Sequence, residues 1–381
     1  MGGLIGKSLH CRLLAAFVTQ STVPPINRCA PVYGMAEFVT GSAHDGTEDT
    51  LESYFSFGVV ADIQYADIDD GYNFMKTRMR YYRNSLTLLK DAVAEWSKES
   101  QRPKFILQLG DIIDGYNVPH KTSEKSLTKV LSETETLRIP FHHIWGNHEF
   151  YNFSRKDLTE SKLNSKPLED KSDSRTMNKE TSGLSDHQES FYGYHFSPFP
   201  KFRFLLIDSY DLSVIGRDPS SAMYEKSMKL LKEKNHNENM NSPKGLEEPQ
   251  FVEFNGGIGV SQLNWIDGVL ASSDEKEEKV VVVGHLPIHP DATDAICLAW
   301  NHKEILSVLQ AHPCVVAYFA GHDHDGGYCV DSCGIHHITF RGVIETPPVT
   351  QAFGTMYMHR DRMVLKGRGL VSSRVLPYRH S

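Results

Sequence analysis

Five short apolar runs, each followed directly by polar residues, dominate the hydrophobic pattern of the chain. The runs cover residues 57–61, 105–109, 141–145, 280–283 and 315–320, and they have the length and residue types of buried strands. In open α/β sheets, ligands bind just beyond the carboxyl ends of the strands. We therefore expect the five polar stretches that follow these runs to lie close together in space.

Between the runs, the spacing of apolar residues changes to that of helices. Leu86, Leu89, Val93 and Trp96 predict a helix within residues 73–96. Further helices are expected over residues 123–137, 262–270 and 301–310, with Ser261 as the N-cap of the second of these. The alternation of strands and helices is typical of a layered α/β domain.

Two polar segments interrupt this alternation. Residues 154–190 are rich in Lys, Glu, Asp, Ser and Asn, and they are expected to be a mobile surface insertion. Residues 217–255 form a second insertion, with a short helical piece over residues 224–232. Two strands, residues 191–196 and 201–207, are predicted between the insertions.

The ends of the chain differ from its middle. Residues 1–50 are expected to be a disordered extension, and residues 371–381 a C-terminal tail. Residues 51–370 would then form a single catalytic domain that includes both insertions. Its last part, residues 328–365, is expected to contain several β-strands.

The five polar stretches carry side chains that bind hard or borderline divalent cations. The candidate ligands are Asp62, Gln64, Asp111, Asn147, His285, His322 and His324. Oxygen and imidazole donors without thiolate favour Mn, Fe or Mg over a structural zinc. Seven ligands are too many for one octahedral ion that must leave a position open for substrate. The set therefore predicts two ions that share one carboxylate, and Asp111 is the natural bridge.

Each polar stretch by itself is a weak signal, because a single histidine after a strand is more often a structural hydrogen-bonding residue. All five stretches occur in order, each after a predicted strand, and this joint pattern favours the two-metal site. His322 and His324 stand two residues apart after a glycine, so each histidine can serve a different ion.

A pair of such ions predicts hydrolysis of a phosphoester or phosphoanhydride. Two ions roughly 3.5–4 Å apart supply a metal-bound hydroxide for in-line attack and neutralise the charge on the phosphate oxygens. His148 adjoins a candidate ligand but is not needed as one, and we expect it to protonate the leaving oxygen or to stabilise its charge. Asp114 and Glu149 are expected to orient ligands rather than to bind metal.

The charge of the chain limits the classes of partner. The 381 residues contain 40 Lys plus Arg against 48 Asp plus Glu, which gives a formal net charge of -8. This balance argues against broad binding of nucleic acid, which requires a basic surface. The sequence shows no apolar run long enough to span a membrane. We therefore expect a monomer that acts on small molecules.

The cysteines and the first residues of the chain bear on its compartment. The six cysteines form no C-x-x-C pair and are expected to be reduced thiols of a cytoplasmic protein. Residues 1–36 contain no Asp or Glu but include Lys7, Arg12 and Arg28, a composition typical of a mitochondrial transit peptide. A dispensable tail ahead of a downstream start at Met35 would explain the same composition.

The order of the motifs resembles that of the calcineurin-like metallophosphoesterases, in which D-x-H, G-D, G-N-H-E, a lone His and G-H-x-H follow one another. This resemblance implies a two-sheet core flanked by helices, a four-layer α/β/β/α sandwich. It also implies one ion held by Asp62, Gln64, Asp111 and His324, and a second held by Asp111, Asn147, His285 and His322.

Gln64 departs from this pattern, because most members of the superfamily have His at that position. A neutral amide oxygen is a weaker and harder ligand than imidazole, so it should loosen the first ion and favour Mn over Zn. The hydrolytic interpretation is unaffected, since all other ligands and His148 are present.

Longer stretches resemble one branch of the superfamily, the manganese-dependent ADP-ribose/CDP-alcohol diphosphatases. The similarity is carried by residues 62–67, 111–117, 146–153 and 321–328, and it extends from about residue 55 to residue 369. It implies cleavage of ADP-ribose to AMP and ribose 5-phosphate, and of CDP-alcohols such as CDP-choline to CMP and a phosphoalcohol. The implied cofactors are two divalent ions, Mn²⁺ first, with Mg²⁺, Fe or Zn²⁺ as alternatives.

The residues that would bind the nucleobase are less well indicated. Tyr72 and Phe74 follow the first polar stretch, where an aromatic face is placed to stack on a base, and Phe74 is our candidate substrate contact. An equally good interpretation makes both residues hydrophobic contacts at the start of the first helix.

Two other functions fit the same fold. One is hydrolysis of a different phosphoester, in a cyclic nucleotide, a phosphoprotein or the end of a nucleic acid. The other is a non-catalytic scaffold, which would be expected to lack the acid or several ligands. Only Gln64 is unusual here, so the pattern favours an enzyme.

Overall fold

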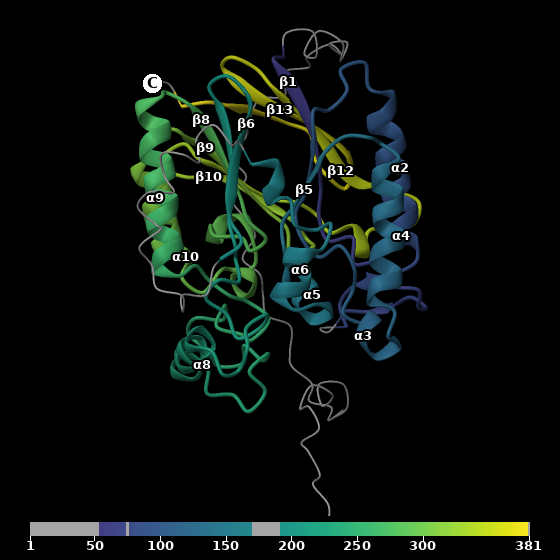
Figure 1. Cartoon of the computed structure of the whole chain (residues 1–381), viewed down its shortest axis with the longest axis vertical. Helices are drawn as coiled ribbons and strands as arrows, with labels where there is room; N and C mark the ends of the chain where they lie inside the picture. The colour runs from purple at the N-terminus through teal and green to yellow at the C-terminus, as the bar shows by residue number, and fades with distance from the viewer. Residues whose placement is uncertain (1–52, 74–75, 170–190, 380–381) are drawn as a thin grey trace, which may run out of the picture. The chain divides into compact units, whose positions relative to one another are not determined.

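Two six-stranded sheets lie face to face in the part of the chain that the structure describes (Figure 1). The structure is a computed structural model and describes residues 53–73, 76–169 and 191–379. The first sheet has the order β14 (Arg374–Pro377), β13 (Arg362–Gly369), β12 (Ala352–Met358), β1 (Phe55–Val60), β4 (Ile106–Gln108) and β5 (Phe141–His143). The second has the order β10 (Gly327–Val330), β11 (His336–Thr339), β9 (Val315–Ala320), β8 (Lys279–Val283), β7 (Phe202–Leu206) and β6 (Tyr194–Phe199).

Within each sheet, the strands that precede the polar stretches are parallel to one another. In the first sheet β1 pairs with β4 and β4 with β5, all in parallel. In the second sheet β7, β8 and β9 are parallel in the same way. The five predicted strands are thus confirmed, with ends that differ by one or two residues. Their carboxyl ends meet at one edge of each sheet.

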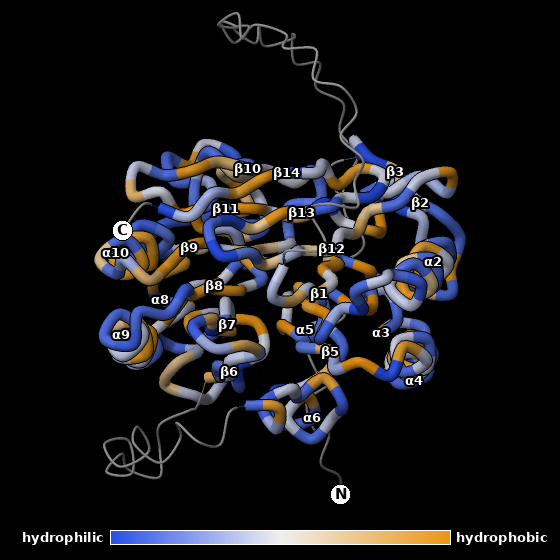
Figure 2. Tube along the Cα trace, turned by 90° about the horizontal axis from the view of Figure 1, so that it is seen from above, coloured by the Kyte–Doolittle hydropathy of each residue, from blue (hydrophilic) through white to orange (hydrophobic). Residues whose placement is uncertain are grey.

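Helices cover the outer face of each sheet, as Figures 1 and 2 show. α2 (Asn84–Lys98) and α4 (Ser123–Glu135) lie along the first sheet, whereas α9 (Val260–Glu275) and α10 (His302–Ala311) lie along the second. The arrangement is the α/β/β/α sandwich that the resemblance implied.

Aromatic side chains fill the space between the sheets. The ring of Phe57 on β1 meets that of Phe204 on β7 edge to face at 5.0 Å, and Phe105 meets Phe204 in the same way. All three rings are buried. Such contacts bury large apolar areas and fix the spacing of the two sheets, on which the geometry of their edges depends.

The first helix begins later than predicted. Instead of a helix from residue 73, the chain forms a short antiparallel pair, β2 (Gly71–Tyr72) and β3 (Met79–Arg80), and α2 starts at Asn84. The side chain of Asn73 accepts hydrogen bonds from the backbone N–H groups of Thr77 and Arg78 and closes this turn. A local side-chain bond of this kind competes with helix formation.

The N-cap prediction for α9 was also wrong. The helix begins at Val260 with Gly259 as its N-cap, so Ser261 lies inside the first turn. Asp211, from a distant loop, accepts a 2.9 Å hydrogen bond from the Gly259 backbone N–H group. A tertiary contact therefore sets the start of this helix, which the local sequence cannot reveal.

Both insertions pack on the domain where they are described. The first contains α6 (Arg155–Glu160) and a 3₁₀ turn, η1 (Lys166–Leu168), and it buries Leu158 and Leu163. The expectation of a mobile segment is therefore wrong for residues 154–169. Residues 170–190 lie outside the described part.

The second insertion contains the predicted helical piece as α8 (Ala222–Lys234). Leu231 and Phe251 of this insertion pack in an apolar cluster with Leu212, Val214 and Trp300, which lie outside it. The expected C-terminal tail includes β14, the outermost strand of the first sheet, which pairs with β13.

Some predictions concern residues outside the described ranges. These are the disordered extension over residues 1–50, the transit peptide over residues 1–36 and the substrate contact of Phe74. Among the residues that are described, no helix has the length and apolar character needed to cross a membrane.

Candidate metal centre

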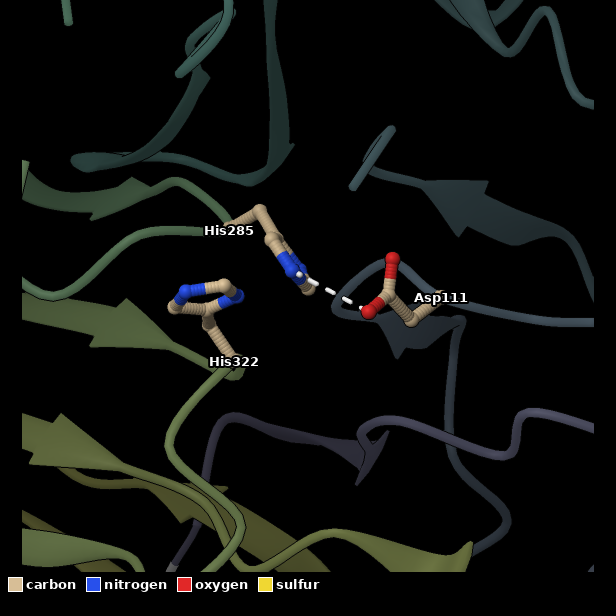
Figure 3. Close-up of side chains that lie close together, drawn as sticks. All are labelled: Asp111, His285 and His322. Atoms are coloured by element: carbon tan, nitrogen blue, oxygen red, sulfur yellow. Dashed lines mark ion pairs between the residues drawn. The ribbon is translucent and has the colours of Figure 1, made fainter. Parts of the chain in front are cut away.

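The loops after β1, β4, β5, β8 and β9 bring the predicted ligands together. Asp111, His285 and His322 come from three of these loops, and each can offer a ligand atom within 4.8 Å of the others (Figure 3). Asp111 Oδ2 lies 3.5 Å from His285 Nε2. All three side chains converge although they are far apart in the sequence, and they form the half of the site expected for the second ion.

Gln64, His324 and Asp62 form a second chain of contacts that starts from the same oxygen of Asp111. Gln64 Nε2 is 3.1 Å from Asp111 Oδ2 and 3.0 Å from His324 Nε2. His324 Nε2 in turn is 3.7 Å from Asp62 Oδ1. Asp111 therefore contacts a member of each proposed group of ligands, as a bridging ligand must.

Asn147 begins α5 (Asn147–Asn152), and its side-chain oxygen accepts a hydrogen bond from the Tyr210 hydroxyl. The backbone N–H of the next residue, His148, donates a 2.9 Å hydrogen bond to Asp111 Oδ1. A Cβ atom on the preceding Gly146 would lie 2.2 Å from Asp111 Oδ1 and 2.7 Å from His285. Only glycine can therefore bring this loop so close to the cluster.

Glu149 holds two of the loops in place rather than facing the cluster as a ligand. Its buried carboxylate accepts hydrogen bonds from the backbone N–H groups of Asp111, Ile112 and Gly146 at 2.6–2.8 Å. Burial and the neighbouring Asp111 raise its pKa to about 7, although these three bonds oppose the rise. This arrangement agrees with the orienting role that the sequence predicted.

Two buried atoms of the cluster lack hydrogen-bond partners among the described residues: Gln64 Oε1 and His285 Nε2. The His285 ring is oriented by a 2.7 Å contact between Nδ1 and the backbone oxygen of Leu109. Nδ1 therefore carries a hydrogen, and Nε2 points into the cluster. Buried polar atoms are normally paired, so the open position at His285 Nε2 fits a bound cation. Gln64 turns its NH₂ group towards Asp111 and His324, and its amide would have to reverse for Oε1 to bind an ion between them.

The electrostatics of the cluster also fit a cation. Burial lowers the pKa of His285, but the Asp111 carboxylate outweighs burial and raises it to about 9. Burial likewise opposes Asp62 and Glu345, which raise the pKa of His324 to about 10. Burial and the adjacent His285 hold the pKa of His322 well below its usual range. In the protein alone, protons thus balance the carboxylates that a metal ion would otherwise neutralise.

Four of the seven predicted ligands have left-handed backbone conformations. The φ angles are 49° at Asp62, 43° at Gln64, 56° at Asp111 and 68° at His322. Each such conformation costs a non-glycine residue on the order of 1–3 kcal/mol and tends to occur at functional sites. Positive φ is uncommon for any residue other than glycine, although Asp and His adopt it more often than most types, so the sequence alone does not locate it.

His148 lies beside the cluster with its ring in a defined tautomer. Nδ1 accepts a 2.8 Å hydrogen bond from the backbone N–H of Gly115, so in the neutral ring the hydrogen is on Nε2. Nε2 is 3.9 Å from Asp111 Oδ2 and therefore faces the centre. Asp114 Oδ2 lies 3.4 Å from Nδ1 and would stabilise a positive charge on the ring.

Several supporting residues were missed by the sequence patterns. The hydroxyl of Tyr210 donates to Asn147 Oδ1 at 3.2 Å, and Ser209 Oγ accepts from the backbone N–H of His285 at 3.0 Å. Ser209 and Tyr210 both follow β7. The polar residues after this predicted strand could therefore have indicated that they lie near the cluster. Glu345 accepts from His324 Nδ1 at 2.9 Å, and Asn255 contacts His322. Neither of the last two follows a predicted strand.

The aromatic residues suggested for base stacking are only partly described. Tyr72 lies in β2, and 62% of its surface is exposed. Phe74 is outside the described ranges. The stacking hypothesis therefore stays a prediction.

The chain is similar to proteins of known family. The family model described as calcineurin-like phosphoesterase matches residues 55–326. The manganese-dependent ADP-ribose/CDP-alcohol diphosphatase of Xenopus laevis is 64% identical over 328 residues, which covers 86% of this chain and 92% of that protein. The human protein of the same name is 55% identical over 335 residues, which covers 88% of this chain and 96% of that protein.

A solved structure is similar over nearly the same region. The crystal structure of a dimetal phosphatase from Danio rerio superposes with a TM-score of 0.79 and 48% sequence identity. The match covers 86% of this chain and 100% of the Danio rerio chain. The similarity thus extends over the whole sandwich described above.

Proposed function

Because this chain belongs to the calcineurin-like phosphoesterase family, we propose that it is a two-metal hydrolase of the diphosphate bond in ADP-ribose and in CDP-alcohols. The products would be AMP with ribose 5-phosphate, and CMP with a phosphoalcohol. The observation that carries the proposal is one cluster of ligand-type side chains, in which His285 Nε2 lacks a hydrogen-bond partner within the described chain; the cluster consists of Asp62, Gln64, Asp111, His285, His322 and His324.

We propose that the two ions are held by overlapping sets of side chains. The first set is Asp62, Gln64, Asp111 and His324, and the second is Asp111, Asn147, His285 and His322. The contact of Asp111 with a member of each group supports this division. When bound, a pair of divalent ions lowers the pKa of the attacking water and neutralises phosphate charge.

We propose His148 as the general acid. Its Nε2 carries the hydrogen and faces the centre, and its Nδ1 is held by the Gly115 backbone. To act as an acid the ring must be an imidazolium, whose Nδ1 hydrogen faces Asp114 Oδ2 instead of Nδ1 accepting from Gly115. Transfer of the Nε2 proton to the leaving phosphate oxygen then leaves the neutral ring. Asp114, 3.4 Å from Nδ1, then stabilises the ring whenever it is positively charged.

Gln64 and Phe74 would adapt this centre to its cofactor and substrate. The amide oxygen of Gln64 supports Mn²⁺ as the preferred ion, because an imidazole at this position would favour Zn²⁺. Phe74 would stack on the nucleobase. An unchanged KM for ADP-ribose in Phe74→Ala would remove Phe74 from the base-binding site.

A substrate panel tests the proposed reaction. Purified protein is incubated with ADP-ribose, CDP-choline, a cyclic nucleotide and a phosphopeptide, each with Mn²⁺, Mg²⁺ or a chelator, and the products are identified. We expect Mn²⁺-dependent cleavage of the two diphosphates into the four products named above. Faster cleavage of the cyclic nucleotide or phosphopeptide would favour another phosphoesterase, and no turnover on any substrate would favour a scaffold.

The organisation of the chain and its state in the cell complete the proposal. Residues 51–370 would form the catalytic domain of a monomer that acts in the cytoplasm, or in mitochondria if residues 1–36 direct it there. Small nucleoside diphosphate derivatives would be its partners. Light scattering after gel filtration tests whether the protein is a monomer. Imaging of a C-terminal fluorescent fusion tests whether it lies in the cytoplasm or in mitochondria.

A further inference from the structure

Asn255, at the end of the second insertion, contacts a candidate metal ligand directly. Its side chain is fully buried, and Oδ1 lies 2.8 Å from His322 Nε2. Asn255 lies 67 positions before His322 in the chain and belongs to none of the five polar stretches. If His322 Nε2 donates the hydrogen in this contact, the lone pair that can bind a metal ion is on Nδ1. The direction of this hydrogen bond therefore has to be established.

The orientation of the Asn255 amide follows from its other neighbours. The side-chain nitrogen is 2.9 Å from the backbone oxygen of Gln250, 2.6 Å from that of Ile296 and 3.3 Å from that of Leu298. Backbone oxygens only accept hydrogen bonds, so the NH₂ group must face them. A reversed amide would place four oxygen atoms together without a hydrogen. The amide oxygen of Asn255 is therefore the atom that faces His322.

This orientation fixes the tautomer of His322. An amide oxygen accepts but cannot donate, so His322 Nε2 must carry the hydrogen. A neutral imidazole has a single N–H group, which leaves the lone pair on Nδ1. Figure 3 shows one ring nitrogen of His322 directed towards His285 and Asp111 and the other directed away from them. This view agrees with an Nδ1 atom that faces the centre.

We propose that Asn255 is a positioning residue, which holds His322 with its hydrogen on Nε2 and presents Nδ1 to the second ion. This inference rests on the proposed two-metal function. It connects the second insertion to the metal centre through a buried side chain. Groups that orient the other nitrogen of a metal-bound histidine commonly change metal affinity by 10- to 100-fold.

A neighbouring contact strengthens the connection. The Tyr210 hydroxyl lies 3.3 Å from the backbone oxygen of Phe254 and 3.2 Å from Asn147 Oδ1. Phe254 and Asn255 are adjacent, and through these contacts they support Asn147 and His322, two proposed ligands of the same ion. Loss of Asn255 should therefore affect the second ion more than the first.

The test measures Mn²⁺ binding by the electron paramagnetic resonance signal of free Mn²⁺ during titration. We compare the wild type with Asn255→Leu, which keeps the size of the side chain but removes the amide. The matched control is Asn235→Leu in the same insertion. Asn235 is also buried, and its side-chain nitrogen also lies near three backbone oxygens, those of Met240, Ser242 and Phe251, but it contacts none of the proposed ligands.

We expect two Mn²⁺ ions per wild-type chain, and in Asn255→Leu one of the two bound more weakly by about 10- to 100-fold. Asn235→Leu should bind both as the wild type does. Unchanged binding in folded Asn255→Leu, or equal weakening in both variants, would overturn the positioning role. A wild type that binds fewer than two ions and hydrolyses no diphosphate would instead refute the proposed function.

A second measurement applies even if Asn255→Leu does not fold. Nuclear magnetic resonance is applied to wild type labelled with ¹⁵N-histidine and loaded with diamagnetic Mg²⁺. The ¹H–¹⁵N couplings of the His322 ring show which nitrogen carries the hydrogen. The His322 signals are identified by their absence from the spectrum of His322→Gln. We expect the hydrogen on Nε2. A hydrogen on Nδ1 would overturn the inference while leaving the two-metal centre intact.

Discussion

Two polar clusters lie next to each other at the strand ends, and they differ in how fully their atoms are paired. In the metal centre, Gln64 Oε1 and His285 Nε2 have no hydrogen-bond partner in the described chain, and His285 Nε2 has only the 3.5 Å ion pair with Asp111. In the loop after β7, both carboxylate oxygens of Asp208 are bonded, to the Arg155 guanidinium and to the backbone N–H groups of Tyr192 and Tyr210. The first cluster therefore contains polar atoms without hydrogen-bond partners, whereas both oxygens of the carboxylate in the second cluster have partners.

The charges of the two clusters differ in the same way. Burial would raise the pKa of Asp208, but Arg155 outweighs burial and holds it below its usual range. The carboxylate is thus neutralised by the protein itself. Asp111 is buried as deeply, yet the groups that face it are histidines, which must be deprotonated to bind metal. A binding site for a ligand thus differs from a structural polar cluster in two ways. Some of its polar atoms lack hydrogen-bond partners, and its charge is balanced only by protons that a metal ion can replace.

Replacing Asp111 should have the largest effect. Asp111→Ala removes the one carboxylate shared by both proposed sets of ligands, so we expect loss of both ions and of hydrolysis. Metal content after gel filtration and the rate of ADP-ribose cleavage measure this. The fold should persist, because no buried arginine is left unpaired. A variant that retains two ions would contradict the bridging role.

His148→Ala should separate catalysis from metal binding. Both ions should remain, because His148 is not among the proposed ligands, while turnover should fall by roughly 10²–10⁴-fold, the usual contribution of a general acid. Stopped assays with ADP-ribose, alongside metal analysis of the same samples, check both statements. Wild-type turnover in this variant would exclude the assigned role.

Arg155→Ala should show that the cluster around Asp208 stabilises the fold. Removing this arginine leaves the buried Asp208 charge without its partner, so the free energy of unfolding should fall by about 3 kcal/mol or more. The exposed pair of Arg83 with Asp67 and Asp69 offers a control, for which Arg83→Ala should lower the free energy of unfolding far less. Urea unfolding followed by circular dichroism compares the two variants. Equal losses would contradict the distinction drawn between buried and exposed pairs.

The pH dependence of metal binding should be a smaller effect. The pKa values of His285 and His324 are about 9 and about 10 in the protein without metal, above the ordinary value of 6.5. Their protonation therefore stabilises the metal-free fold fully below pH 6.5, and this contribution is lost as the pH rises through 9 to 10. Because Mn²⁺ must displace these protons, its affinity should increase from pH 6 to pH 8.

Calorimetric titration of Mn²⁺ in buffers with different ionisation enthalpies measures the released protons directly. We expect about one proton for each of these two histidines at pH 7. An affinity that does not change between pH 6 and pH 8, with no proton release, would show that the two rings are neutral before metal binds.

The sequence was informative where local pattern determines structure. Apolar runs predicted the five strands, and polar residues at the strand ends predicted that Asp111, His285 and His322 would meet. These results depend on two properties of the chain, strand hydrophobicity and the parallel arrangement of strands in α/β folds. Both can be recognised without knowledge of tertiary contacts.

The remaining features depend on contacts between distant residues. Asn255 and Glu345 reach His322 and His324 only after the insertion and the loop before β12 have folded onto the sandwich. The start of α9 is set by Asp211, and the left-handed backbone at Gln64 is imposed by its surroundings. No propensity or periodicity of the local sequence encodes such interactions, so only the structure reveals them.

The central claim is that two ions share Asp111, and anomalous scattering tests it most directly. Crystals grown with Mn²⁺ and measured on both sides of the manganese absorption edge should show two strong peaks, one on each side of the Asp111 carboxylate, with Gln64 and His324 beside one and His285 and His322 beside the other. A single peak, or two peaks that do not both contact Asp111, would contradict the account.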